Sequence, residues 1–328
     1  MPSTLGPCRT GQYYVFYDKL FEELGFENVV LFVGEGENSY REFGPGFTKD
    51  LWRAVVLSDY FTDIRSAIKL LARDPVAGTA VFEQCWHDVV DGAVRGGNAL
   101  DQALARSCRA LTAIPRRLGL DEVKKVLVVG EIYVRRDTFS VQELCDHLVG
   151  QGILPKLAGV TEWIHYMDWS QHFLLGREVK RDGLLKALRR GWLGERAWLG
   201  VETWWKRKVE HQIRDALVPT GLIADAPEDM DAALRFGSRT FIDPDLESEA
   251  TISPAVAAAA MGDGYSGIAI IAPFGCLPGR LIEGVYAPWA KARGYPVVAL
   301  ENDGQPYPPN VVSRLEVFAH NVQRFERN

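Results

Sequence analysis

The second half of the chain alternates short apolar runs with segments of helical periodicity. Runs rich in Val, Ile and Leu occupy 125–133, 155–160, 267–272 and 296–300, and continuous runs of this kind are typical of parallel strands buried on both faces. Helical patterns lie at 140–150, 254–261, 280–293 and 310–325. Strands that alternate with helices predict an α/β fold with a parallel sheet.

The first half of the chain has a mainly helical pattern. Apolar residues recur at three- and four-residue spacing over 12–24, and further helical patterns cover 47–73, 80–94 and 99–111. The run 28–33 (NVVLFV) predicts a short buried strand. The loop after it, 34–46, has two glycine clusters that resemble a phosphate cradle, but it lacks the Lys-Ser/Thr of a P-loop, which favours a plain loop.

Local signals mark further boundaries. Ser140, with Glu143 three residues later, has the spacing of a capping box, so we expect Ser140 to be the N-cap of the helix that follows the strand 125–133. The acidic, turn-rich segment 225–249 predicts a linker or a mobile loop. The change in character near residue 120 predicts two domains, 1–120 and 121–328, with a helical insertion at 161–217 in the second.

The insertion 161–217 is rich in tryptophan and in lysine and arginine. One interpretation is a solvated basic face over a tryptophan-filled underside. The other is a docking surface for an acidic partner or for the phosphates of a nucleotide-like substrate. The sequence leaves both open.

Composition narrows the class of protein. The chain has 328 residues, 47% of them hydrophobic, and a net charge of −6, which argues against a nucleic-acid partner. No apolar run approaches a membrane span, and the first residues lack the apolar core of a signal peptide, so a cytoplasmic protein is expected. Five cysteines without an export signal favour reduced thiols or metal ligands over disulfides.

Common catalytic patterns are missing from the sequence. There is no G-x-S-x-G, H-E-x-x-H or C-x-x-C, and no G-x-G-x-x-G that opens a helix. The six histidines are scattered, mostly in helical patterns, where surface or packing roles are favoured. Cys85, Cys108 and Cys145 also lie in helical patterns, where a cysteine is more often a small core residue than a ligand.

Candidate chemistry gathers at the predicted strand ends. Cys276 lies at a strand-to-helix turn, where open α/β sheets place their ligands and where a helix N-terminus favours a thiolate. Cys8 also precedes a helix. Two such thiolates on opposite walls of a cleft would suit a soft metal centre such as an iron–sulfur cluster, although both fit ordinary turn cysteines. The polar residues expected to shape this cleft are Arg9, Gln12, Glu131, Tyr133, Arg135, Asp303 and Gln305.

Several motifs occur in one order along the chain. They are GPCRTGQY at 6–13, VGEIYVRRDTFS at 129–140, TEWIHY at 161–166, PFGCLPG at 273–279, ENDGQ at 301–305 and SRLEVFAHN at 313–321. Together they resemble the 2-hydroxyacyl-CoA dehydratase and benzoyl-CoA reductase D-component family, most closely the carboxyl-terminal module of acyl-CoA dehydratase activase-related proteins. The likeness covers nearly the whole chain.

The resemblance implies a pair of flavodoxin-like lobes, each a doubly wound parallel sheet, with a [4Fe-4S] cluster held by cysteines in the cleft between them. It implies an ATP-dependent activase that delivers single electrons at low potential, and an acyl-CoA thioester as substrate. The cysteines that match the family motifs are Cys8 and Cys276, which are carried over as cluster ligands.

The chain also departs from the family pattern. The family's cluster usually takes three protein cysteines, and the C-x-P motif that precedes the GPCR segment in long relatives is missing here, as is the strand that an α/β unit would place before Cys8. We therefore expect an incomplete first lobe: either the sequence is a piece of a longer polypeptide, or a second subunit or a second copy of the chain completes the lobe. Three alternatives stay open for the third ligand: it comes from another chain, the cluster is held differently, or the cluster is absent.

Three functions remain open from the sequence. The first is an iron–sulfur subunit of a 2-hydroxyacyl-CoA dehydratase-like or benzoyl-CoA reductase-like enzyme. The second is a non-catalytic electron-relay or scaffold subunit of such a complex. The third is a cluster-free binding protein with the same fold.

Overall fold

A computed structural model of the chain describes residues 2–3, 9–31, 34–35, 43–44, 46–183, 185, 191–224, 230–246 and 248–326. Its centre is a four-stranded, all-parallel sheet with the strand order β4-β3-β5-β6. The strands are β3 (Lys124–Gly130), β4 (Ile153–Leu157), β5 (Gly267–Pro273) and β6 (Val297–Asn302). The predicted α/β fold with a parallel sheet is confirmed.

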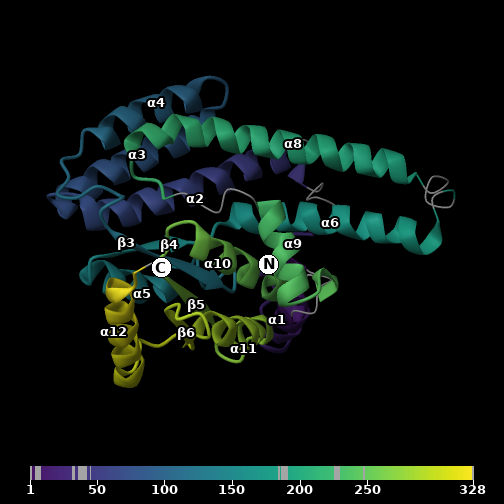
Figure 1. The fold of residues 1–328 in the computed structure, drawn as a ribbon. Helices are drawn as coiled ribbons and strands as arrows, with labels where there is room; N and C mark the ends of the chain where they lie inside the picture. The colour runs from purple at the N-terminus through teal and green to yellow at the C-terminus, as the bar shows by residue number, and fades with distance from the viewer. Residues whose placement is uncertain are drawn as a thin grey trace.

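Both faces of the sheet are covered by helices (Figure 1). The covering helices are α5 (Thr138–Gly150), α10 (Glu249–Gly262), α11 (Leu277–Lys291) and α12 (Pro309–Arg324). Side chains alternate along β3, so that Val126 and Val128 pack with α5 and α12, whereas Leu127 and Val129 pack with α10 and α11. Burial on both faces explains why the strands are apolar without alternation.

A second, helical layer lies beyond β4 and has its own buried core. Helix α2 (Phe47–Leu71) packs against β4 and against the other helices of this layer, and Leu154 of β4 belongs to the same hydrophobic cluster. Two long helices of the layer, α6 (Val160–Asp182) and α8 (Trp192–Leu217), project away from the sheet as a hairpin (Figure 1). The other helices are α3 (Pro75–Arg95) and α4 (Ala99–Thr112).

The N-terminal elements make few contacts in the described part of the chain. Strands β1 (Pro2–Ser3) and β2 (Gly34–Glu35) pair in parallel, and the short helix η1 (Arg9–Gln12) leads into α1 (Tyr13–Glu23). No residue of α1 is buried, although its aromatic side chains form an apolar face. The strand predicted at 28–33 is wrong over 28–31, because these residues form a turn and a segment without regular secondary structure. Residues 32–33 lie outside the described residues.

Two further predictions are corrected. The N-cap of α5 is Asp137, whose carboxylate accepts hydrogen bonds from the Ser140 N–H at 2.9 Å and the Ser140 hydroxyl at 2.7 Å. Glu143 instead accepts from the Tyr307 N–H at 2.9 Å. The capping box does not form because both of its side chains have other partners.

The segment predicted as a linker at 225–249 contains a helix, α9 (Met230–Thr240), followed by the short helix η4 (Pro244–Leu246). Helix α9 packs closely on α10, and a Cβ on Gly237 would lie 2.4 Å from the Ala255 Cβ. The helix is amphipathic: its apolar residues recur at three- and four-residue spacing, and Ala233, Leu234 and Gly237 are buried. Residues 225–229 and 247 lie outside the described part, within which no helix is long and apolar enough to cross a membrane.

Candidate functional site

The sheet order creates a switch point between β3 and β5. Helix α5 follows β3 on one face of the sheet, and α11 follows β5 on the opposite face. At such a point the two connections diverge, and open α/β proteins bind ligands beyond the carboxyl ends of the strands there. The turns after β3 and β5 are therefore the candidate positions for a site, and they carry Glu131 and Cys276.

The turn after β3 depends on Gly130. Its φ is 120°, and a Cβ at this position would lie 2.0 Å from the Ile271 carbonyl oxygen. The close approach lets the Glu131 N–H donate to that oxygen at 3.0 Å. The Glu131 carboxylate then accepts from the N–H groups of Tyr133, at 3.1 Å, and Val134, at 2.8 Å. Glu131 thus closes its own turn, while the Tyr133 side chain is exposed.

Arg135 stabilises the same turn from the interior of the protein. Contrary to the expectation for a cleft wall, its side chain is fully buried. The guanidinium donates to the carbonyl oxygens of Gly130 and Gly159, each at 3.2 Å, and so joins the ends of β3 and β4. Burial raises the pKa of the neighbouring Glu162 to about 7, against the opposing charge of Arg135. Arg135 acts on the conformation of the turn and does not face solvent.

The turn after β5 presents Cys276. Gly275, at φ 68°, reverses the chain, and its N–H donates to the Glu301 carboxylate at 3.1 Å. Cys276 is the N-cap of α11 and is partly exposed. Gly279 brings the first turn of α11 against the strand, because a Cβ there would lie 2.3 Å from the Ala272 Cβ. The predicted strand-to-helix turn at Cys276 is confirmed.

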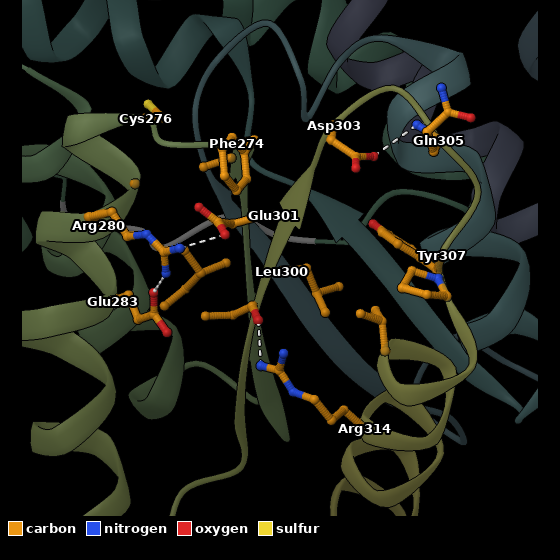
Figure 2. A pocket seen from close by; sticks show the side chains of 16 residues that line it. Phe274, Cys276, Arg280, Glu283, Leu300, Glu301, Asp303, Gln305, Tyr307 and Arg314 are labelled. Carbon is orange, nitrogen blue, oxygen red and sulfur yellow. Dashed lines mark hydrogen bonds and ion pairs between the residues drawn. The ribbon is translucent and has the colours of Figure 1, made fainter.

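Cys276 lies on the rim of a pocket of about 250 Å³ between α11 and α12 (Figure 2). Asp303 and Gln305 line the same pocket, and the Asp303 carboxylate accepts from the Gln305 N–H at 3.0 Å. Arg280 crosses the pocket wall and pairs with Glu283 at 2.7 Å and with Glu301 at 2.5 Å. The structure therefore brings three of the predicted residues to one place, with a mixed set of charges.

The remaining predicted residues do not join this pocket. Glu131 and Tyr133 are on the neighbouring strand end, outside its lining. Gln12 is exposed at the start of α1. Cys8 and the side chain of Arg9 lie outside the described residues.

The other cysteines are in helices, as expected. Cys85 is buried in α3, Cys108 is half-buried in α4, and burial raises the pKa of Cys145, in α5, to about 12. In the described ranges, no group of three or more His, Cys, Asp or Glu side chains could hold a metal ion. The described thiol at the switch point is Cys276.

A layer of buried charge lies between α2 and the sheet, and none of its residues is among the site residues predicted from the sequence. Lys156, in the middle of β4, pairs with Asp63, and burial raises the pKa of Asp63 to about 6 against the charge of Lys156. Arg136 pairs with Asp59 at 2.8 Å, and Asp59 also accepts from the Thr161 N–H at 2.8 Å. Lys156 in an apolar run was the available signal, since a buried lysine needs a partner.

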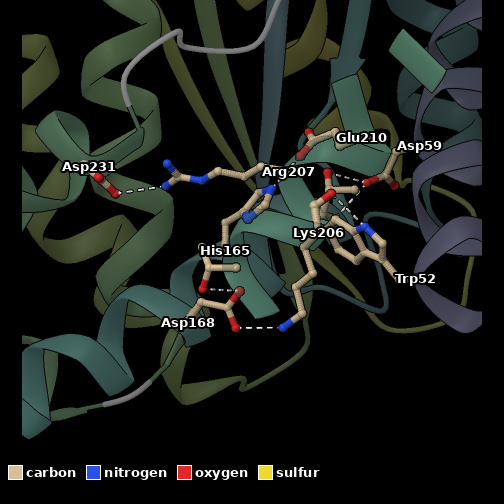
Figure 3. Close-up of polar contacts among 10 residues, drawn as sticks. Trp52, Asp59, His165, Asp168, Lys206, Arg207, Glu210 and Asp231 are labelled. Carbon is tan, nitrogen blue, oxygen red and sulfur yellow. Dashed lines mark hydrogen bonds and ion pairs between the residues drawn. The ribbon is translucent and has the colours of Figure 1, made fainter. Parts of the chain in front are cut away.

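This layer continues between α6 and α8 (Figure 3). His165 Nε2 lies 2.5 Å from the Glu210 carboxylate, and the His165 ring meets the Trp52 ring edge-to-face at 5.4 Å. Lys206 pairs with Asp168 at 2.8 Å. These contacts tie the helical hairpin to α2, and they agree with the packing role expected for the histidine.

No protein-family model, curated protein or solved structure matches this chain.

Proposed function

We propose that this chain is an iron–sulfur subunit of an ATP-dependent, low-potential reductase or dehydratase system that acts on acyl-CoA-type substrates. The observation that carries the proposal is the position of Cys276, partly exposed at the N-cap of α11 and at the switch-point edge of the sheet. The amino end of a helix stabilises a negative charge, and thiolates are the usual ligands of iron–sulfur clusters.

The described residues fit a [4Fe-4S] cluster only in part. Cys276 would supply one ligand from the wall formed by α11. Cys8, which matches the other family motif, would supply a second, and a partner chain would complete the set. A bound cluster would supply one-electron transfer; the residues of this chain would orient the Cys276 thiolate and hold the β5 turn through Glu301.

The strand order supports a flavodoxin-like second lobe. Numbered along the sheet-forming part of the chain, the strands follow the order 2-1-3-4, which is the beginning of the flavodoxin-like order. Among the described residues, the short β1–β2 pair and the lack of a buried residue in α1 agree with a first lobe that a second subunit or a second copy completes. A cleft between two such lobes would have Cys276 on one wall.

The hairpin of α6 and α8 is the proposed contact for the activase or for CoA phosphates. Trp198 and Trp204 of α8 are 70% and 61% exposed, whereas tryptophan side chains are highly buried on average. Cationic groups lie over the rings nearby, with Arg196 over Trp192 and Lys208 over Trp204, each at 5.2 Å. A surface of aromatic rings and cations suits an acidic partner.

Two other functions use the same fold. A non-catalytic electron-relay or scaffold subunit would hold the cluster without binding a substrate. A cluster-free binding protein is favoured by a different observation: the pocket beside Cys276 already contains the paired charges Arg280, Glu283 and Glu301, which suit a small polar ligand.

Anaerobic purification separates these functions. Iron, acid-labile sulfide and absorbance near about 400 nm are measured for the chain, for Cys276→Ser, and for Cys108→Ser as a matched control with a half-buried thiol. The proposal expects the signal to be lost in Cys276→Ser and kept in Cys108→Ser, and to be complete only when the partner subunit is present. Equal iron and sulfide in both variants would contradict it. A spectrum that changes on addition of acyl-CoA favours the catalytic subunit over the relay.

A further inference from the structure

β6 is the outer strand of the sheet in the described part of the chain. The Pro296 carbonyl oxygen accepts from the Ile268 N–H, and the Asn302 carbonyl oxygen accepts from the Phe274 N–H. The backbone groups of alternate residues along β6 therefore face β5. The backbone groups of the residues between them, Val297, Ala299 and Glu301, point away from the sheet. The Arg314 side chain confirms this direction, because it donates to the Ala299 carbonyl oxygen at 2.7 Å from outside the sheet (Figure 2).

A continuous groove follows this edge. Two adjoining pockets, of about 250 and 380 Å³, share Glu283, Ala299 and Arg314 as lining residues. Helix α11 forms one wall and helix α12 the other, and the β6 backbone forms the floor between them. An outer strand with free backbone donors, set between two helices, is a template for another strand.

We infer that a second copy of this chain occupies the groove, with the two β6 strands paired antiparallel about a two-fold axis at Ala299. In this register Ala299 pairs with Ala299 of the second copy, and Val297 pairs with Glu301. Each of these positions has outward backbone groups, so the pairs would exchange N–H···O bonds in the antiparallel pattern. The two sheets then form one continuous sheet.

Charges on α11 support this register. Glu283, Ala287 and Lys291 line the groove at four-residue spacing, with Glu283 beside the carboxyl end of β6 and Lys291 beside its amino end. The two-fold axis would place Glu283 of each copy opposite Lys291 of the other, with the small Ala287 side chains between them. A two-fold interface must be self-complementary in this way.

Helix α12 gives a second complementary pair on the other face. Val317 is 61% exposed beside the groove, and the axis would bring it against its own copy. Arg314 would face Asn321 of the second copy. The Ala299 carbonyl would exchange the Arg314 donor for a backbone donor, so the number of bonds at this oxygen is conserved.

Charge exchange tests the inference in the full-length chain by sedimentation and light scattering. We expect the chain to be a dimer. Glu283→Lys or Lys291→Glu alone should raise the dissociation constant of the dimer at least tenfold, because each variant places like charges together. The double variant Glu283→Lys/Lys291→Glu is expected to dimerise again. A mixture of the two single variants should form a mixed dimer, because opposite charges then meet at both contacts.

The strand contact has its own variant. Ala299→Pro removes an outward N–H and leaves every bond to β5 intact, so it is expected to weaken the dimer while the circular dichroism spectrum and Tm stay near those of the wild type. Glu316→Lys, on the exposed surface of α12 outside the groove, is the matched control. It should leave the dimer found by light scattering unchanged. A monomeric wild type, a dimer that the single charge reversals leave unchanged, or a mixture that stays monomeric would overturn the inference.

Discussion

The turns after β3 and β5 occupy equivalent places in the sheet but are built differently. The turn after β3 is anchored from inside, by the buried Arg135 and by the contact of Gly130 with the Ile271 carbonyl. The turn after β5 is held from outside, by the carboxylate of Glu301 and the surface pairs of Arg280. The first therefore has the structure of a support, whereas the second leaves Cys276 accessible.

The largest expected effect separates the two turns by their glycines. Gly130→Ala should lower the free energy of unfolding by about 3 kcal/mol or more, because it adds backbone strain and a clash with the Ile271 carbonyl. A Cβ at Gly275 would have no atom within 4 Å, so the cost of Gly275→Ala comes only from the left-handed φ. We expect it to lower the free energy of unfolding by about 1 kcal/mol. Urea unfolding of both variants measures the difference. Equal losses would mean that the turns are equally constrained.

The next effect compares the two arginines. Arg135→Met should lower the free energy of unfolding by about 2–4 kcal/mol, because it leaves two buried carbonyls without a donor and removes the strongest cationic influence on Glu162. Arg280→Met should leave Tm nearly unchanged, because its ion pairs are exposed to solvent. Thermal unfolding of the two variants beside the wild type tests this. A larger loss for Arg280→Met would reverse the assignment of support and site.

The pH dependence of stability gives a third test of the buried turn. The pKa of Glu162 is raised to about 7 in the folded state, above its value in the unfolded chain, so the folded state binds the proton more tightly. The stabilisation that comes from this tighter proton binding is complete below the pKa of Glu162 in the unfolded chain. It is lost as the pH rises through the folded-state pKa of about 7. Asp63, whose pKa burial raises to about 6, also lowers the stability of the fold as the pH rises, and its effect is complete at a lower pH than that of Glu162.

Glu162→Gln should therefore be more stable than the wild type at pH 8 by about 2 kcal/mol, and the advantage should shrink toward pH 5. Urea unfolding across this range measures both slopes. Glu316→Gln, which changes an exposed carboxylate on α12, is the control and should leave the slope as it is in the wild type. An advantage that grows toward acid pH would contradict the sign.

The smallest effect on stability is expected at Cys276. Cys276→Ser should change the free energy of unfolding by less than about 0.5 kcal/mol, because the side chain is partly exposed and serine is a good N-cap residue. The same variant should remove an alkylation site that reacts faster than the described Cys85, which is buried, and Cys145, whose pKa burial raises. Mass spectrometry of the alkylated protein reads out the order of the thiols.

Part of this site could be predicted from local sequence. The segment from the end of β5 into α11 contains Pro273, Gly275, Pro278 and Gly279, which are strong turn and helix-start signals, so they predict the position of Cys276. The inward direction of Arg135 had no such signal. It depends on the carbonyl of Gly159, 24 residues away, which meets Gly130 only when β3 and β4 pair.

The wrong predictions have two origins. A capping box at Ser140 is a valid local pattern, but Asp137 is an equally good N-cap, and the partner of Glu143 is the distant Tyr307, so a long-range contact of comparable free energy decides the cap. Helix α9 carries a local signal that the acidic, turn-rich residues around it obscure. Its residues Met230, Ala233, Leu234 and Gly237 recur at three- and four-residue spacing and form an amphipathic face.

The sequence by itself determined the alternation of strands and helices, since burial on both faces of a sheet requires continuous apolar runs and covering helices require an apolar stripe. It also determined that a thiol stands at the turn after β5. Only the tertiary structure decided that one turn is a buried support and the other an accessible rim, and that β6 presents an outer edge. The reason is that these features depend on pairing between segments more than 20 residues apart, which no local pattern encodes.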